Sequence, residues 1–199
     1  METERKGKRR SYESVAVVMD GRGRLRVEGF GPLGESLFAL IGDGQTILLR
    51  PPQETEFLSV GQAGLERALG VAISLGDLCA ALGGNVLLPQ SEAGVQAGCE
   101  SGGHCIIQFP GDGGIRRIYV SRPSGEGADV AIADGEDRYD GGTIVYRGRF
   151  EDRTAISGYS FPQQVTLENP DRALRLMVRY EEVEVNMPVE EGLFLGDSQ

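Results

Sequence analysis

The chain has 199 residues, which is enough for one domain with a substantial buried core. Its formal net charge of −10 argues against nucleic acid as a partner, because phosphates require a basic surface. The 30 glycines and 9 prolines predict many turns, which favours β-structure with short connections. A single His leaves one candidate for histidine-dependent catalysis.

The charge is unevenly distributed along the chain. The first ten residues carry five Lys or Arg against two Glu, a balance of +3, which leaves −13 for the remainder. We expect residues 1–11 to form a basic, solvated and disordered tail on a single domain over 12–199. The alternative is an arm that contacts anionic lipid headgroups. No apolar run reaches the length of a spanning helix, and we find no signal peptide and no Cys near the N-terminus for lipidation. We therefore expect the chain as given to be soluble.

Strands dominate the first sixty residues. One predicted hairpin joins Val15–Met19 to Arg24–Phe30 through Asp20-Gly21, and a second joins Ser36–Ile41 to Thr46–Leu49. In the strand that begins at Arg24, apolar and charged residues alternate, as in a sheet with one solvated face. A short strand over 56–60 would complete a meander.

After residue 60, the spacing of the apolar residues changes from the spacing typical of a strand to the three- or four-residue spacing typical of a helix. Short helices are predicted over 61–69 and 75–82, the second preceded by Ser74 in a capping-box pattern with Asp77. Each helix has one apolar face, so we expect both to cover one opening of the sheet. Residues 90–103 are small, polar and glycine-rich, and they are predicted to form a loop.

Strands resume in the second half of the chain. They are predicted over 105–109, 115–120, 128–133, 143–150, 164–167 and 173–185, with Asp134-Gly135 as a turn after the third. In the last predicted strand, the apolar residues occupy every second position from Leu174 to Tyr180, and the pattern shifts by one residue before Val183 and Val185. This shift at Glu181-Glu182 predicts a bulge that bends the strand. The expected fold class is mainly β (α+β), with a curved antiparallel sheet around a cavity.

The segment from Cys99 to Cys105 is the best candidate for covalent chemistry. The two Cys bracket a glycine-rich stretch and are expected to form a disulfide in an oxidising compartment; a metal site that includes His104 and a pair of free thiols are the alternatives. Cys79 is expected to pack as a small core residue. Nothing near His104 resembles a nucleophile elbow, and the carboxylate pairs have the pattern of solvated faces. We expect no enzyme activity, no cofactor and no metal site.

Three stretches resemble the family of LolB, the outer-membrane lipoprotein receptor, and a group of LolB-like lipoproteins. They are Leu25–Gly34 before an apolar strand, Leu69–Leu78 leading to Gly84, and Phe161–Leu167 followed by Leu174–Asn186. Together they cover about half of the chain. The resemblance implies an open, incomplete β-barrel with an apolar lining and the short helices as a lid.

The resemblance also implies a function: binding or transfer of lipoprotein acyl chains, or of other lipid, at the periplasmic side of the outer membrane. A periplasmic lipoprotein carrier would be a partner, and the full-length protein would be lipid-anchored. The family's protruding apolar loop corresponds to Pro32 and Leu33. An acyl chain that buries about ten methylenes gains roughly 8 kcal/mol. The expected lining residues of the cavity are Leu25, Val27, Phe38, Leu40, Val165, Leu167, Leu176 and Val178. The alternative is a non-catalytic structural or assembly module with the same fold.

Overall fold

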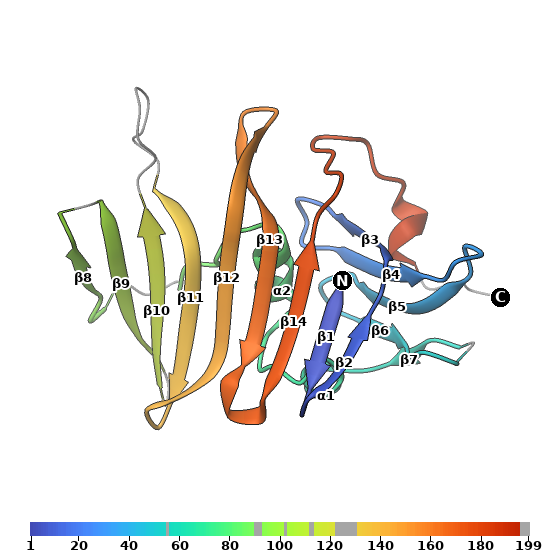
Figure 1. The fold of residues 1–199 in the computed structure, drawn as a ribbon, viewed down its shortest axis with the longest axis horizontal. Helices are drawn as coiled ribbons and strands as arrows, with labels where there is room; N and C mark the ends of the chain where they lie inside the picture. The colour runs from blue at the N-terminus through green and yellow to red at the C-terminus, as the bar shows by residue number, and fades with distance from the viewer. Residues whose placement is uncertain (55, 90–92, 102, 112–113, 122–130, 196–199) are drawn as a thin grey trace.

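The computed structural model describes residues 1–54, 56–89, 93–101, 103–111, 114–121 and 131–195, which form two antiparallel sheets and two α-helices (Figure 1). The large sheet has the strand order β2-β1-β14-β13-β12-β11-β10-β9-β8, and the small sheet has the order β3-β4-β5-β6-β7. Both sheets are curved and they do not close into a barrel, which confirms the predicted fold class. The large-sheet strands are β1 (Glu2–Arg5), β2 (Lys8–Ser11), β8 (Gln96–Cys99), β9 (His104–Gly111), β10 (Gly114–Ser121), β11 (Ile132–Asp140), β12 (Thr143–Ile156), β13 (Tyr159–Asn169) and β14 (Leu174–Arg179).

The small sheet is the predicted meander. Its strands are β3 (Ser14–Met19), β4 (Leu25–Phe30), β5 (Ser36–Gly42), β6 (Ile47–Arg50) and β7 (Leu58–Ser59). Asp20 fixes the first hairpin, because its carboxylate accepts hydrogen bonds from the backbone N–H groups of Arg22 and Arg24 at 2.9 and 3.0 Å. Asp43 does the same for Gln45 and Thr46 in the second hairpin.

Both predicted helices are present, and they lie between the two sheets. They are α1 (Gln62–Leu69) and α2 (Leu75–Leu82). Ser74 caps α2: its hydroxyl accepts from the backbone N–H of Asp77 at 3.0 Å and donates to the Asp77 carboxylate at 2.7 Å. Apolar side chains of the helices, including Leu65 and Leu78, form one cluster with residues of both sheets. The helices therefore supply the middle layer of the core.

The first eleven residues are a β-hairpin, so the expectation of a disordered tail is wrong. β1 pairs with β14, in register from Glu2 opposite Met177 to Arg5 opposite Leu174, and β2 pairs with β1. Lys6 and Gly7 form the turn, and both have positive φ angles, 50° and 76°. The basic segment is thus the edge of the large sheet.

Two further predictions in the wing of the large sheet (strands β8–β11, which extend beyond the small sheet in Figure 1) need correction. The expected loop over 90–103 contains β8, and the expected strand over 128–133 falls partly outside the described residues. The expected turn at Asp134-Gly135 lies inside β11. Glycine at position 135 allows β12 to approach β11 closely, because a Cβ there would lie 2.3 Å from the Gly148 carbonyl oxygen of β12.

The last strand ends at Arg179, so the predicted bulge at Glu181-Glu182 is absent. Tyr180 follows β14: its backbone N–H still donates to the Gln163 carbonyl of β13 at 2.9 Å, and its hydroxyl donates to the Leu82 carbonyl of α2 at 2.8 Å. The chain then reaches the outer face of the small sheet, where the short 3-10 helix η2 (Glu191–Phe194) places the buried Phe194 ring 4.5 Å from the Arg24 guanidinium. The shift of the apolar pattern at Glu181-Glu182 therefore lies where the chain passes from the large sheet to the small sheet.

Candidate functional site

The side chains predicted to line a cavity gather in one apolar cluster between the sheets. Seven of them are at most 8% exposed, and Phe38 is half-buried. Leu25, Val27, Phe38 and Leu40 come from the small sheet, whereas Val165, Leu167, Leu176 and Val178 come from β13 and β14. The sequence therefore identified the inner faces of both sheets correctly.

The space between these inner faces is occupied by the protein itself. A chamber wide enough for a hydrocarbon chain would leave accessible surface on its walls, and the seven buried side chains have almost none. Leu65, Leu78 and Leu82 of the helices and Ile73 of their connection belong to the same cluster and fill the gap. The structure thus shows a filled core at this place in the described residues, and not the expected open cavity.

The apolar inner face continues outward along the small sheet. Leu40, Leu49 and Leu58 are direct cross-strand neighbours on β5, β6 and β7, so their side chains point to the same face. Leu40 is 5% exposed, Leu49 is half-buried, and Leu58 is 51% exposed. An apolar row therefore runs from the core to the surface.

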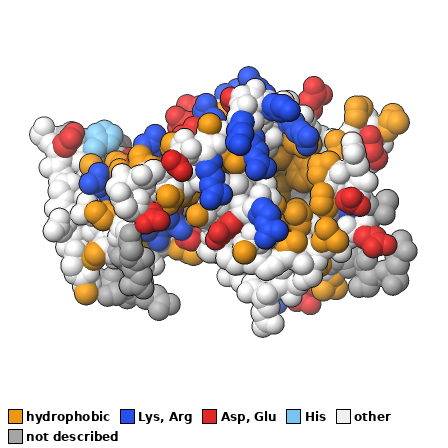
Figure 2. Space-filling model, turned by 90° about the horizontal axis from the view of Figure 1, so that it is seen from below, with side chains coloured by type: hydrophobic (Ala, Val, Ile, Leu, Met, Phe, Trp, Pro, Cys, Tyr) orange, Lys and Arg blue, Asp and Glu red, His pale blue; other side chains and the backbone are white. Residues whose placement is uncertain are grey.

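Other apolar side chains border this row. The rings of Tyr12 and Phe38 meet edge to face with centroids 4.8 Å apart, and Val60 packs against the core just after β7. We call the surface formed by Tyr12, Phe38, Leu49, Leu58 and Val60 the mouth. On the face shown in Figure 2, apolar side chains gather in a hollow beside a group of Lys and Arg side chains. Sequence reasoning missed Leu49 and Leu58, because Ile47, Leu48 and Leu49 form an unbroken apolar run that does not distinguish the two faces of the strand.

A buried charge cluster ties α2 to the large sheet. The Asp77 carboxylate lies 2.8 Å from the Arg138 guanidinium and 3.8 Å from that of Arg116, and Glu136 pairs with both arginines. Desolvation by burial opposes ionisation of Asp77, but the hydrogen bonds and charges of Arg138, Ser74 and Arg116 outweigh it and lower the pKa of this carboxyl. The ionised Asp77 therefore tethers the helix that covers the inner face.

The loop expected to touch a membrane protrudes from the small sheet between β4 and β5. Leu33 is 94% exposed, and its backbone N–H donates to the Glu35 carboxylate at 3.0 Å. Pro32 is also exposed. The connection from β6 to β7 leaves the same end of the sheet, because neighbouring strands are antiparallel. Insertion of Leu33 into a bilayer stays a prediction.

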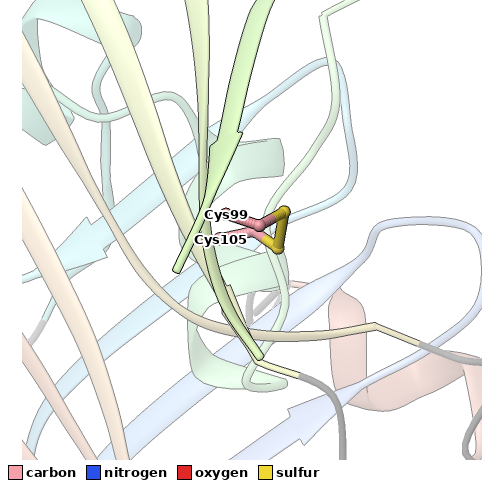
Figure 3. The surroundings of a disulfide bond; sticks show 2 residues. All are labelled: Cys99 and Cys105. Carbon is pink, nitrogen blue, oxygen red and sulfur yellow. A yellow bond between two sulfur atoms is a disulfide. The ribbon is translucent and has the colours of Figure 1, made fainter. Parts of the chain in front are cut away.

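The Cys99–Cys105 pair lies at the opposite edge of the large sheet from the mouth. The two residues are opposite each other in β8 and β9 and are joined by a disulfide (Figure 3). His104 is exposed, and no group of three metal-ligating side chains occurs among the described residues. Burial raises the pKa of the remaining thiol, Cys79, to about 11, which keeps it protonated.

Among the residues described, no helix is long and apolar enough to cross a membrane. No protein-family model and no curated protein matches the chain by sequence. Several solved structures are similar in fold, including the following two. A LolA superfamily protein from Nitrosomonas europaea superposes with a TM-score of 0.60 at 13% identity, over 98% of this chain and 87% of that one. A DUF1329 family protein from Desulfovibrio piger superposes with a TM-score of 0.56 at 13% identity, over 98% and 86%. Two curved sheets that hold short helices between them, together with these superpositions, establish a LolA-like fold.

Proposed function

We propose that this protein binds the acyl chain of a lipid or lipoprotein at the mouth and that it has no catalytic role. The observation that carries the proposal is the row Leu40–Leu49–Leu58, which joins the buried core to solvent without a polar interruption. An acyl chain needs contiguous apolar surface and no directional chemistry.

The filled core sets the depth of binding. A chain that lies along the row covers Leu49 and Leu58 without any rearrangement, and each methylene removed from water contributes about 0.8 kcal/mol. Deeper entry requires the helix side chains to move out of the gap between the sheets. Two short helices, each of eight residues, form this middle layer, and Asp77 holds one of them in place. We therefore propose shallow binding first and deeper binding on displacement of the helices.

The finer proposal is transfer of lipoproteins or lipids in the bacterial envelope, between a periplasmic carrier and the inner surface of the outer membrane. The LolA-like fold and the exposed Leu33 support it. A lipid-anchored full-length form would place the mouth near that membrane.

Displacement of a fluorescent fatty acid tests the binding proposal. We expect saturable binding to the wild type and at least a tenfold loss in Leu49→Glu, because a carboxylate would interrupt the apolar row. Leu48→Glu is the matched control, since Leu48 neighbours Leu49 and faces the outer side of the same strand. Leu58→Glu, at a half-exposed position, repeats the test without perturbing the core. Equal binding by all four folded proteins would overturn the proposal.

The alternative is a non-catalytic assembly module that works through a sheet edge. One observation favours it: every residue of β8, the outermost strand of the wing, is exposed. Absence of fatty-acid binding together with saturable capture of a partner by the wild type, lost when β8 is changed, would favour this module over the acyl-chain proposal.

A further inference from the structure

We infer that the ligand of the mouth carries an anionic headgroup, which is held by Arg5, Lys8 and Arg10 on the inner face of the β1–β2 hairpin. The inference rests on the proposed function, acyl-chain binding, and adds the charge of the head. The ligand class is therefore an anionic lipid.

The pairing register places these three side chains on the inner face. Leu174 and Leu176 are buried in the core, so they mark the inner side of β14. Arg5 is opposite Leu174, and Lys8 is opposite Arg5. Thr3 is opposite Leu176, and Arg10 is opposite Thr3. Directly opposite residues of antiparallel strands share a face, so all three cations lie on the side of the core.

The cations are adjacent to the mouth. Tyr12, two residues after Arg10, continues the same face and touches Phe38 of the mouth. At the turn end of the hairpin, Arg5 is opposite Leu174. The Leu174 side chain packs directly against Gly70, the residue that ends α1. The inner side of the hairpin thus borders the mouth.

The charges on the two faces of the hairpin are balanced differently. On the outer face, Arg9 pairs with Glu2, and Arg175 lies 3.3 Å from Glu168. Across the described ranges of the chain, no carboxylate lies within ion-pair distance of Arg5, Lys8 or Arg10, and all three are exposed. In a protein of net charge −10, this face concentrates positive charge that lacks a partner.

An amphiphile with an anionic head complements this arrangement. Its acyl chain would lie along Leu49 and Leu58 while its head reaches the hairpin, where arginine and lysine donate charge-assisted hydrogen bonds to phosphate or carboxylate oxygens. Each basic residue near an anionic lipid group strengthens binding by roughly fivefold at physiological ionic strength. A neutral or zwitterionic head would gain much less.

The test compares two monomeric lysolipids with the same acyl chain, lysophosphatidylglycerol and lysophosphatidylcholine, by displacement of the fluorescent fatty acid below their micelle concentrations. A parallel pair, oleate and oleyl alcohol, separates carboxylate from phosphate as the source of the charge. The variants are Lys8→Gln/Arg10→Gln on the inner face and, as the control, Arg9→Gln/Arg175→Gln on the outer face. Both double variants change the net charge equally.

We expect the wild type to prefer lysophosphatidylglycerol by about tenfold, and the inner double variant to lose most of this preference while the outer one keeps it. The preference should shrink as salt is raised from 0.05 to 0.5 M, because the sites are exposed. Equal affinity for both lysolipids, or equal loss in both double variants, would overturn the headgroup assignment and leave acyl-chain binding intact. Failure of all four lipids to bind would overturn both proposals.

Discussion

The contact between Asp77 and Arg138 predicts a specific loss of stability when α2 is released from the large sheet. Asp77→Asn keeps the shape of the side chain and the acceptor for Ser74 but removes the charge. Removing one partner of a buried ion pair costs about 3–5 kcal/mol. Arg138 retains Glu136 at 2.8 Å, and the Asp77 side chain is 15% exposed, so we reduce the expected loss to about 2 kcal/mol.

Urea denaturation at pH 7 measures this loss. Glu191→Gln is the control, because it breaks the Arg22–Glu191 pair, whose side chains are 73% and 76% exposed, and should cost less than about 0.5 kcal/mol. A double-mutant cycle with Arg138→Gln should give a coupling free energy of at least about 1 kcal/mol.

The pH dependence provides a second check with a defined sign. The folded-state pKa of Asp77 is lowered, so its contribution is complete above the unfolded value of about 3.9 and is lost as the pH falls through the folded value. The stability difference between the wild type and Asp77→Asn should therefore shrink below about pH 4. The reasoning is refuted if Asp77→Asn loses no more stability than Glu191→Gln at pH 7.

Three further substitutions test other parts of the fold. Leu65→Ala should destabilise the protein by about 2–5 kcal/mol in urea unfolding, because this fully buried side chain joins α1 to the core, and a loss below 1 kcal/mol would contradict the filled interior. Gly84→Ala should lower the free energy of unfolding by more than about 1 kcal/mol, since Gly84 has a φ of +71° and its new Cβ would lie 2.2 Å from Pro162 Cδ. An unchanged melting temperature would show that this contact is absent. Cys99→Ser/Cys105→Ser should speed amide hydrogen exchange in β8. It should lower global stability by at most about 2 kcal/mol, because the disulfide joins residues only six positions apart. Unaltered exchange in β8 would show that the disulfide does not hold this edge strand in place.

The predictable parts of the fold are those whose signals are local. Asp20 and Asp43 stand at the turns of two hairpins and accept backbone hydrogen bonds there, as their sequence context indicates. Ser74 and Asp77 mark the beginning of α2 in the same way. Alternation indicates the inner faces of β4, β13 and β14, and the eight residues predicted from the sequence gather in one apolar cluster.

The unpredictable parts depend on contacts between distant segments. Gly135 is expected in a turn but is required where β12 approaches β11. The basic hairpin has no apolar alternation of its own, and its strands are specified by pairing with β14. Whether the inner faces enclose a cavity or a packed core depends on how far α1 and α2 enter the gap, and no local pattern encodes that depth. Leu58 was missed because β7 has only two residues and shows no period.

The edge of the large sheet at β2 carries positive charges that resist pairing with another chain. An unpaired strand exposes backbone N–H and C=O groups that recruit further strands, and lysine or arginine on such an edge discourages this. Lys8, Arg9 and Arg10 are three of the four residues of β2, the last strand on its side. A bound anion that neutralises two of these charges would weaken that protection, so ligand occupancy and self-association should rise together in sedimentation measurements. The strand that borders the mouth would then link loading of the protein to its oligomeric state.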